Sequence, residues 1–115
     1  MTETGKPAAA GGIDPILLSV LARAFKAITD EMSISIERTA RSPILCEAKD
    51  FVTGLYDGRG RMLEQTENLP ILAFSLAPVC KYIKQYFGDD LHPGDVIFHN
   101  DVFSLGNQNN DVAVF

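Results

Sequence analysis

The stretch that decides the fold spans residues 14–43 and reads DPILLSVLARAFKAITDEMSISIERTARSP. Asp14 is a favourable N-cap, and Pro15 suits the first helical position, where its missing N–H would be unpaired anyway. Apolar residues then recur at helical spacing: Leu17, Leu21, Ala24, Phe25, Ile28, Met32, Ile36 and Ala40. Because Ser42-Pro43 disfavours helical backbone, the pattern predicts one long amphipathic helix that ends there.

Several short stretches further along the chain indicate β-strands. Residues 51–56 and 61–65 flank the turn 57–60, an arrangement typical of a β-hairpin. Residues 96–99 form a short apolar run that predicts a buried strand. Residues 112–115 begin another strand, whose edge is completed either within this small domain or by another chain. We expect another chain, because much of the apolar surface of the long helix also lacks a partner here.

A second helix is expected from Ser75 to Phe87, with Pro78 in its first turn and Gly88 at its end. The fold class is therefore α+β: a long N-terminal amphipathic helix, a β-hairpin, a second helix and short strands, completed by partner subunits. Residues 1–12 are small and polar and predict a mobile N-terminal arm, followed by one domain over residues 13–115.

The amino-acid composition argues against several classes of function. The chain has 115 residues and a formal net charge of −5, which argues against binding of duplex nucleic acid and of anionic membrane surfaces. No apolar run approaches the length of a membrane span, and the start lacks the apolar core of a secretory signal. Cys46 and Cys80 form no CxxC pair, so we expect free thiols and a cytoplasmic location.

Four motifs, in their order and spacing, resemble the hydantoinase B family. They are DPIL at residues 14–17, IERTARSP at residues 36–43, KDF followed by LYDGRGR within residues 49–61, and PGDVIFHND at residues 93–101. The resemblance covers nearly the whole chain after the predicted arm, but only the N-terminal segment of the family's pattern. The family includes subunits of N-methylhydantoinases, of 5-oxoprolinases, and of acetone and acetophenone carboxylases.

The resemblance implies a function inside a complex. A small chain of this kind fits a structural or assembly subunit of an ATP-dependent, biotin-independent ketone carboxylase of the acetophenone type. Its partners would be larger hydantoinase A-like and hydantoinase B-like subunits in a hetero-oligomer, with ATP bound by those partners and no cofactor bound by this chain. Two alternatives stay open. One is a partial site of a metal-dependent hydantoinase- or oxoprolinase-type amidohydrolase, completed by a partner chain, and the other is a free-standing regulatory binding module.

The family's site motif reads approximately N-D-P-Y-x-G-G-T-H-x-x-D, with His and Asp as metal ligands in the metal-dependent members. Residues 100–111 correspond to it and retain Asp101 and Asp111, but Gln108 stands where the motif has His. A carboxamide oxygen is a poor ligand for transition metals. We therefore expect no catalytic residue and no metal site here, with Asp101, Asp111 and His99 as the remaining candidate ligands.

Other residues with reactive or charged side chains have simpler explanations. His99 could act as a general base, but a strand-end histidine hydrogen-bonded to a neighbour is the expected state. His92 precedes a Pro-Gly turn and is expected in solvent. Glu37, Arg38 and Arg41 could grip an anion together with Lys49, although we expect surface ion pairs.

Overall fold

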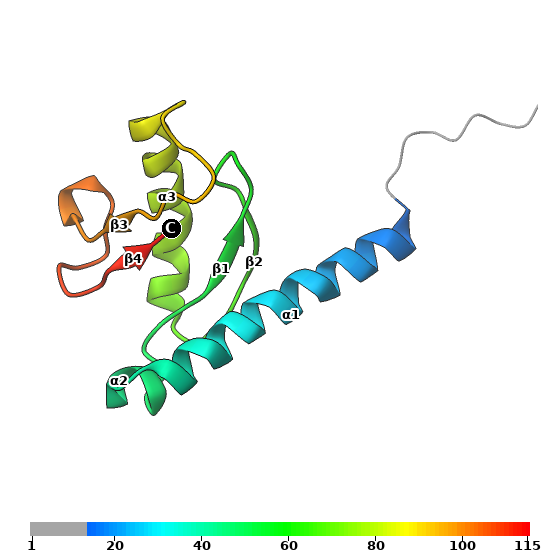
Figure 1. Ribbon diagram of the computed structural model, residues 1–115, viewed down its shortest axis with the longest axis horizontal. Helices are drawn as coiled ribbons and strands as arrows, with labels where there is room; N and C mark the ends of the chain where they lie inside the picture. The colour runs from blue at the N-terminus through cyan, green and yellow to red at the C-terminus, as the bar shows by residue number, and fades with distance from the viewer. Residues whose placement is uncertain (1–13) are drawn as a thin grey trace, which may run out of the picture.

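The computed structural model describes residues 14–115, and the predicted arm lies outside the described residues. The elements follow in the order α1 (Pro15–Thr39), α2 (Pro43–Cys46), β1 (Gly54–Tyr56), β2 (Met62–Gln65), α3 (Pro70–Phe87), β3 (Phe98–His99), the 3-10 helix η1 (Val102–Ser104) and β4 (Ala113–Val114). This mixture of helices and short strands confirms the predicted α+β class (Figure 1).

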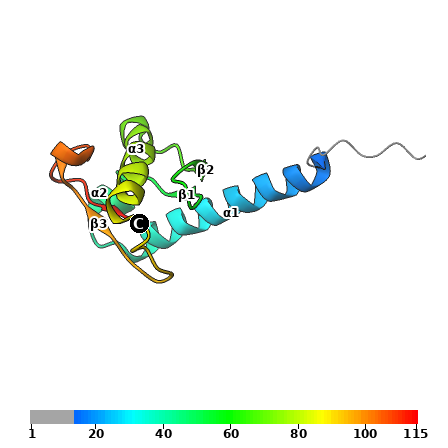
Figure 2. The same ribbon diagram turned by 90° about the horizontal axis from the view of Figure 1, so that it is seen from above.

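Helix α1 begins and ends where the sequence predicts. The Asp14 carboxylate accepts a hydrogen bond from the N–H of Ile16 at 2.9 Å, and the backbone of Ala40 turns extended just before Pro43. The N-terminal half of α1 projects away from all other described elements in both views (Figures 1 and 2). Its apolar stripe is therefore largely uncovered, and the buried residues of α1 are Thr29 and Ser33.

A cluster of three buried threonines joins α1 to the β-hairpin. The Thr53 hydroxyl donates to the carbonyl oxygen of Thr29 at 2.9 Å, and the Thr53 N–H donates to the hydroxyl oxygen of Thr66 at 2.9 Å. The N–H of Thr66 in turn donates to the carbonyl oxygen of Thr53 at 2.8 Å. Because Thr53 precedes β1 and Thr66 follows β2, the cluster joins the open end of the hairpin to α1 through the bond of Thr53 to Thr29.

The predicted hairpin is confirmed, with β1 and β2 antiparallel and Gly54 opposite Gln65. Its turn is held by the Asp57 carboxylate, one oxygen of which accepts the N–H groups of Arg59 and Arg61 at 2.9 Å each. Gly60 has a φ of +72°, and a Cβ there would lie 3.1 Å from the backbone nitrogen of Lys81. The turn therefore packs closely against α3, and a side chain at this position would be strained both by the left-handed backbone and by the contact with Lys81.

The prediction for α3 was wrong at its start. The helix begins at Pro70, which takes the first helical position, so Pro78 lies inside the helix and not in its first turn. Pro78 cannot donate to the carbonyl of Phe74, which costs a helical hydrogen bond. Ala73 before Pro78 and Val79 and Ile83 after it are buried, and packing of an apolar face stabilises a helix more than its individual propensities do. Gly88, with a φ of +58°, ends the helix as predicted.

The two C-terminal strands pair with each other, which corrects the expectation that another chain completes residues 112–115. Strands β3 and β4 form an antiparallel ribbon with Phe98 opposite Val114 and His99 opposite Ala113. The expectation of a buried strand at residues 96–99 was also wrong, because Phe98 is 71% exposed. Only one face of this ribbon rests on α3, which lies between the ribbon and the hairpin (Figures 1 and 2).

We expect Thr53→Val to destabilise the fold by about 1–3 kcal/mol, because it removes a buried donor and leaves its partner oxygens without it. The measurement is urea unfolding of the full chain. Thr39→Val is the matched control: its hydroxyl donates to Ser35 at 2.7 Å on an exposed helix end, so the loss should stay below about 0.5 kcal/mol. Equal losses of unfolding free energy in the two variants would contradict the role of the Thr53 hydroxyl in joining the hairpin to α1.

Candidate functional site

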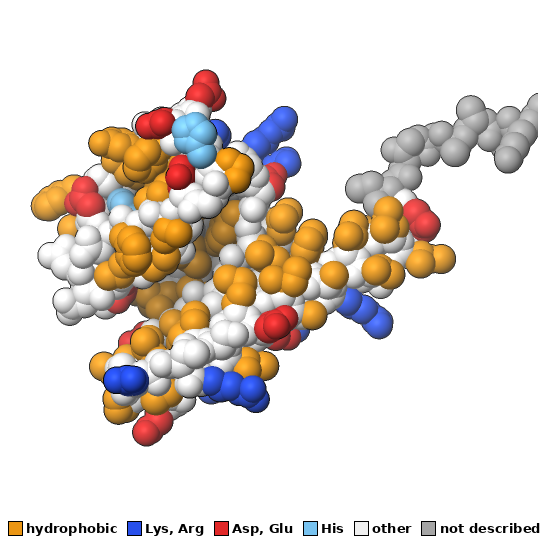
Figure 3. All heavy atoms as spheres, in the orientation of Figure 1, with side chains coloured by type: hydrophobic (Ala, Val, Ile, Leu, Met, Phe, Trp, Pro, Cys, Tyr) orange, Lys and Arg blue, Asp and Glu red, His pale blue; other side chains and the backbone are white. Residues whose placement is uncertain are grey.

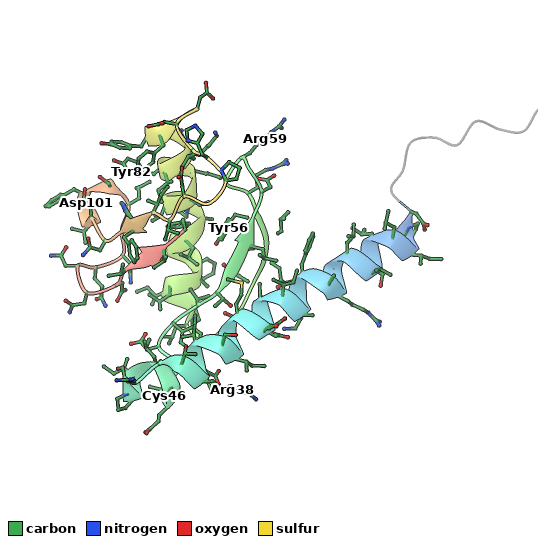
Figure 4. The ribbon with its side chains drawn as sticks, viewed as in Figure 1. Arg38, Cys46, Tyr56, Arg59, Tyr82 and Asp101 are labelled. Atoms are coloured by element: carbon green, nitrogen blue, oxygen red, sulfur yellow. The ribbon has the colours of Figure 1, made fainter. Side chains whose placement is uncertain are left out.

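The loop between β3 and β4 carries the residues of the site motif. It starts beside His99 and returns to Ala113, so the pairing of the two strands brings its ends together. The Asn100 side-chain amide donates across the loop to the carbonyl oxygen of Asn109 at 3.0 Å. Figure 4 labels Asp101 on this loop, on the side of α3 away from α1.

Asp101 organises the first half of the loop. One carboxylate oxygen accepts the N–H of Phe103 at 3.0 Å, and the other accepts the hydroxyl of Ser104 at 2.6 Å, so the side chain caps η1. These two bonds, the one from Ser104 first, hold the pKa of the Asp101 carboxyl below its usual range. Gly106 closes the turn by donating its N–H to the carbonyl oxygen of Asp101 at 2.9 Å. A Cβ at Gly106 would lie 2.7 Å from that oxygen, which explains why the position needs glycine.

Asp111 organises the second half of the loop. Its two carboxylate oxygens accept the side-chain amides of Asn107 at 2.6 Å and of Gln108 at 2.9 Å. Gln108, which stands where the family's motif has histidine, is thus bonded directly to the aspartate of the same motif. Each oxygen of Asp111 thus accepts an amide donor from a neighbouring side chain, and sequence reasoning missed this pairing.

His99 lies beneath the loop against α3. Its ring centroid is 5.8 Å from that of Tyr82, which Figure 4 labels on α3. Its Nε2 atom is buried, and no described residue bonds to it. The expected hydrogen bond to a neighbour is therefore not found at this nitrogen. His92 is exposed in its turn, as predicted.

The candidate ligands do not form one cluster. Within residues 14–115, no three His, Cys, Asp or Glu side chains gather closely enough to hold a metal ion. Asp101 bonds within the first half of the loop, Asp111 bonds within the second half, and the imidazole of His99 packs on Tyr82. As arranged, both carboxylates stabilise the loop.

The charged residues at the end of α1 form a separate surface. Lys49 makes an ion pair with Glu37 at 3.0 Å, while Arg38 and Arg41 stay exposed. The pair borders a hollow of about 570 Å³ between α1 and β2, which is also lined by Asp30, Glu64 and Glu67. The expected surface ion pairing is thus confirmed for Lys49 and Glu37, and the two arginines do not join a shared anion site.

The two cysteines are free thiols, as predicted. The Cys46 thiol donates to the carbonyl oxygen of Ser42 at 3.1 Å. Burial raises the pKa of the Cys80 thiol and raises that of the nearby Tyr56 hydroxyl to about 12. A raised pKa lowers the thiolate fraction at neutral pH, so Cys80 is a poor nucleophile.

The family model described as Hydantoinase B/oxoprolinase matches residues 14–115, the same residues that the structure describes. The chain belongs to this family. The resemblance inferred from the four motifs is therefore confirmed.

Curated relatives of this chain include proteins named for different substrates. It is 35% identical over 103 residues to the beta subunit of a caprolactamase from Pseudomonas jessenii, covering 90% of this chain and 18% of the relative. A 5-oxoprolinase of Pestalotiopsis fici is 29% identical, over 98% of this chain and 9% of the relative. A protein of a Pseudomonas species, named as the B-type subunit of a D-/L-hydantoinase, is 30% identical, over 88% of this chain and 18% of the relative.

The chain thus spans less than a fifth of the length of these relatives. No solved structure matches it. Within residues 14–115, no helix is long and apolar enough to cross a membrane.

We expect that Gln108→His will not create a zinc site in this chain. The new imidazole would join Asp111 alone, whereas protein zinc sites use three or four protein ligands. Calorimetric titration of Zn²⁺ into the variant should match that of the unaltered chain. Micromolar or tighter binding that appears only in the variant would contradict this prediction.

The low pKa of Asp101 predicts that acid weakens the turn at η1. The ionised carboxylate stabilises the loop above the ordinary value of 3.8, and this contribution is lost as the pH falls through the lower folded pKa. Ser104→Ala removes the largest cause, so the titration midpoint of Asp101 should rise toward 3.8. Carboxyl NMR titration measures it, and an unchanged midpoint would count against this account of the turn.

Proposed function

We propose that this chain is the assembly segment of a B-type subunit in an ATP-dependent complex that hydrolyses a cyclic amide. The observation that carries the proposal is the uncovered N-terminal half of α1 in a chain that belongs to the hydantoinase B/oxoprolinase family. Larger A-type and B-type partner subunits would contact this surface and bind ATP.

The first turns of α1 carry large apolar side chains over a wide arc. These residues are between 41% and 74% exposed, and they are Ile16, Leu17, Leu18, Val20 and Leu21. A large exposed apolar surface of this kind marks a contact with another part of a larger structure. Burying each of these side chains contributes roughly 1.5–3 kcal/mol, so a partner that covers the turn gains considerable free energy. Figure 3 shows the hydrophobic side chains along this part of the helix.

The site loop supports an assembly role for the chain. The carboxylate oxygens of Asp101 and Asp111 accept hydrogen bonds from Ser104, Asn107 and Gln108, so they stabilise the loop. Replacing the motif histidine by Gln108 removes an imidazole that could bind a metal or move a proton. The reacting groups of the complex would then be supplied by partner residues.

The substrate class follows from the names of the relatives. Caprolactam, 5-oxoproline and hydantoin each contain an amide C–N bond within a ring, and three of the relatives are named for these compounds. We therefore favour ring opening of a cyclic amide. Carboxylation of a ketone of the acetophenone type, expected from the motifs, is the alternative reaction.

The test is reconstitution with a relative. The caprolactamase beta subunit, from which the 103 matched residues are deleted, is co-expressed with the other subunits of that enzyme and with this chain. We expect ATP-dependent ring opening of caprolactam with this chain and none without it. A reconstituted complex that carboxylates acetophenone and leaves caprolactam intact would replace the proposed reaction by the alternative.

In the same co-expression, we expect Leu17→Asp to release the chain, because it buries a charge in an apolar contact. Arg23→Asp introduces the same side chain on the same helix at a charged, exposed position and should stay bound. Co-purification measures both variants. Retention of Leu17→Asp together with loss of Arg23→Asp would mean that charge, and not the apolar surface, carries recognition.

A further inference from the structure

The ribbon of β3 and β4 has two different faces. One face rests on α3, where the His99 ring lies 5.8 Å from that of Tyr82. Because side chains alternate along a strand, the other face gathers four apolar side chains that are exposed by 63%, 71%, 55% and 58%, namely Val96, Phe98, Val112 and Val114. Figure 3 shows hydrophobic side chains gathered on this side of the molecule.

The backbone of this ribbon has open edges. Ile97 and Phe115 exchange two hydrogen bonds of 2.9 Å, so the next pair, Phe98 and Val114, is a non-hydrogen-bonded pair. The N–H and C=O groups of Phe98 and Val114 therefore point to the two outer edges, and no described residue bonds to them. A ribbon of two short strands is marginal alone, and a third strand would satisfy one of these edges.

A hollow beside β3 offers room for a side chain of such a strand. It measures about 520 Å³ and has a mixed lining: the apolar residues are Phe87, Leu91, Val96, Ile97 and Phe98, and the polar ones are Asp90, His92 and Asp95. Residues 96–99 and 112–115 contain no Lys, Arg, Asp or Glu. The surface therefore suits an apolar strand.

Negative charge at the two ends of β3 favours one kind of strand over another at its open edge. Asp95 and Asp101 flank the strand, and both are exposed. Two copies of this chain paired antiparallel about Phe98 would place Asp95 of one opposite Asp101 of the other, twice, which is unfavourable. A strand flanked by Lys or Arg fits the same edge. In the caprolactamase beta subunit, about four-fifths of the polypeptide lies outside the matched segment and could contain such a strand.

We infer that this face, together with the edge of β3, binds an apolar β-strand flanked by Lys or Arg, from the part of a B-type polypeptide outside the matched segment. The inference rests on the proposed function, because it takes the occupant from a B-type polypeptide. It adds a contact surface separate from the first turns of α1. Phe98 lies on the ribbon, which is on the opposite side of α3 from the hairpin, and the N-terminal half of α1 projects away from both (Figures 1 and 2).

The test uses the complex with the truncated caprolactamase beta subunit. Phe98→Asp should lower the amount of chain that co-purifies by about tenfold or more, as expected for a central apolar contact. Gln85→Asp adds the same charge at an exposed position of α3 and should leave the amount unchanged. In the unaltered complex, hydrogen exchange at the Phe98 amide should slow relative to the chain alone.

The outcomes separate this inference from the proposed function. Full retention of Phe98→Asp, with unchanged exchange at the Phe98 amide, overturns the inference even if the complex opens caprolactam. Slowed exchange in a complex that opens no lactam supports the inference and removes the proposed reaction. A dimer of the chain alone that Phe98→Asp abolishes would identify a second copy as the occupant and overturn the inference, as would failure of the chain to join the truncated subunit.

Discussion

The hydrogen bond from the Thr53 hydroxyl to the carbonyl oxygen of Thr29 is the contact on which the rest of the arrangement depends. It fixes the hairpin across α1, and the hairpin then positions α3 through the close approach of Gly60 to Lys81. Helix α3 supports the ribbon through the contact of Tyr82 with His99. Helix α1 therefore positions the hairpin, the hairpin positions α3, and α3 positions the ribbon.

A polar contact can determine the arrangement of the elements because the apolar core is small. The buried apolar side chains of the described residues are Phe51, Ala73, Val79 and Ile83. Far more large apolar side chains lie on the surface, above all on the first turns of α1 and on the open face of the ribbon. The first turns of α1 and the ribbon lie at opposite ends of the molecule (Figures 1 and 2). The structure therefore exposes apolar surface at two separate places.

The loop between β3 and β4 is held by its own polar side chains. Asp101 and Gly106 build the turn around η1 through bonds to Phe103 and to the carbonyl oxygen of Asp101. In the second half of the loop, the Gln108 side chain donates to Asp111. Both aspartates therefore act in this structure as hydrogen-bond acceptors that stabilise the loop.

Local chemistry made the helix ends and turns predictable from the sequence. Three such features depend on partners within four residues along the chain: the cap at Asp14 and Pro15, the turn at Asp57 and the end of α3 at Gly88. Because both partners of each interaction lie in one short stretch of sequence, the interaction can be predicted from that stretch. The family, too, was recognisable from short motifs in a fixed order. The start of α3 was not predictable, because a proline locally favours the first turn of a helix, whereas Pro78 lies inside a helix whose residues Val79 and Ile83 are buried.

The tertiary structure alone decided which surfaces meet. Helical period places Leu21, Phe25, Ile28 and Met32 on one face, yet the buried residues of α1 are Thr29 and Ser33. The bonds responsible join Thr53 to residues 24 positions before it and 13 positions after it. Likewise, the amide bonds of Gln108 and Asn107 to Asp111 exist only because the ribbon brings the loop's ends together. Periodicity shows which residues share a face, but the choice of neighbour depends on contacts between distant parts of the chain.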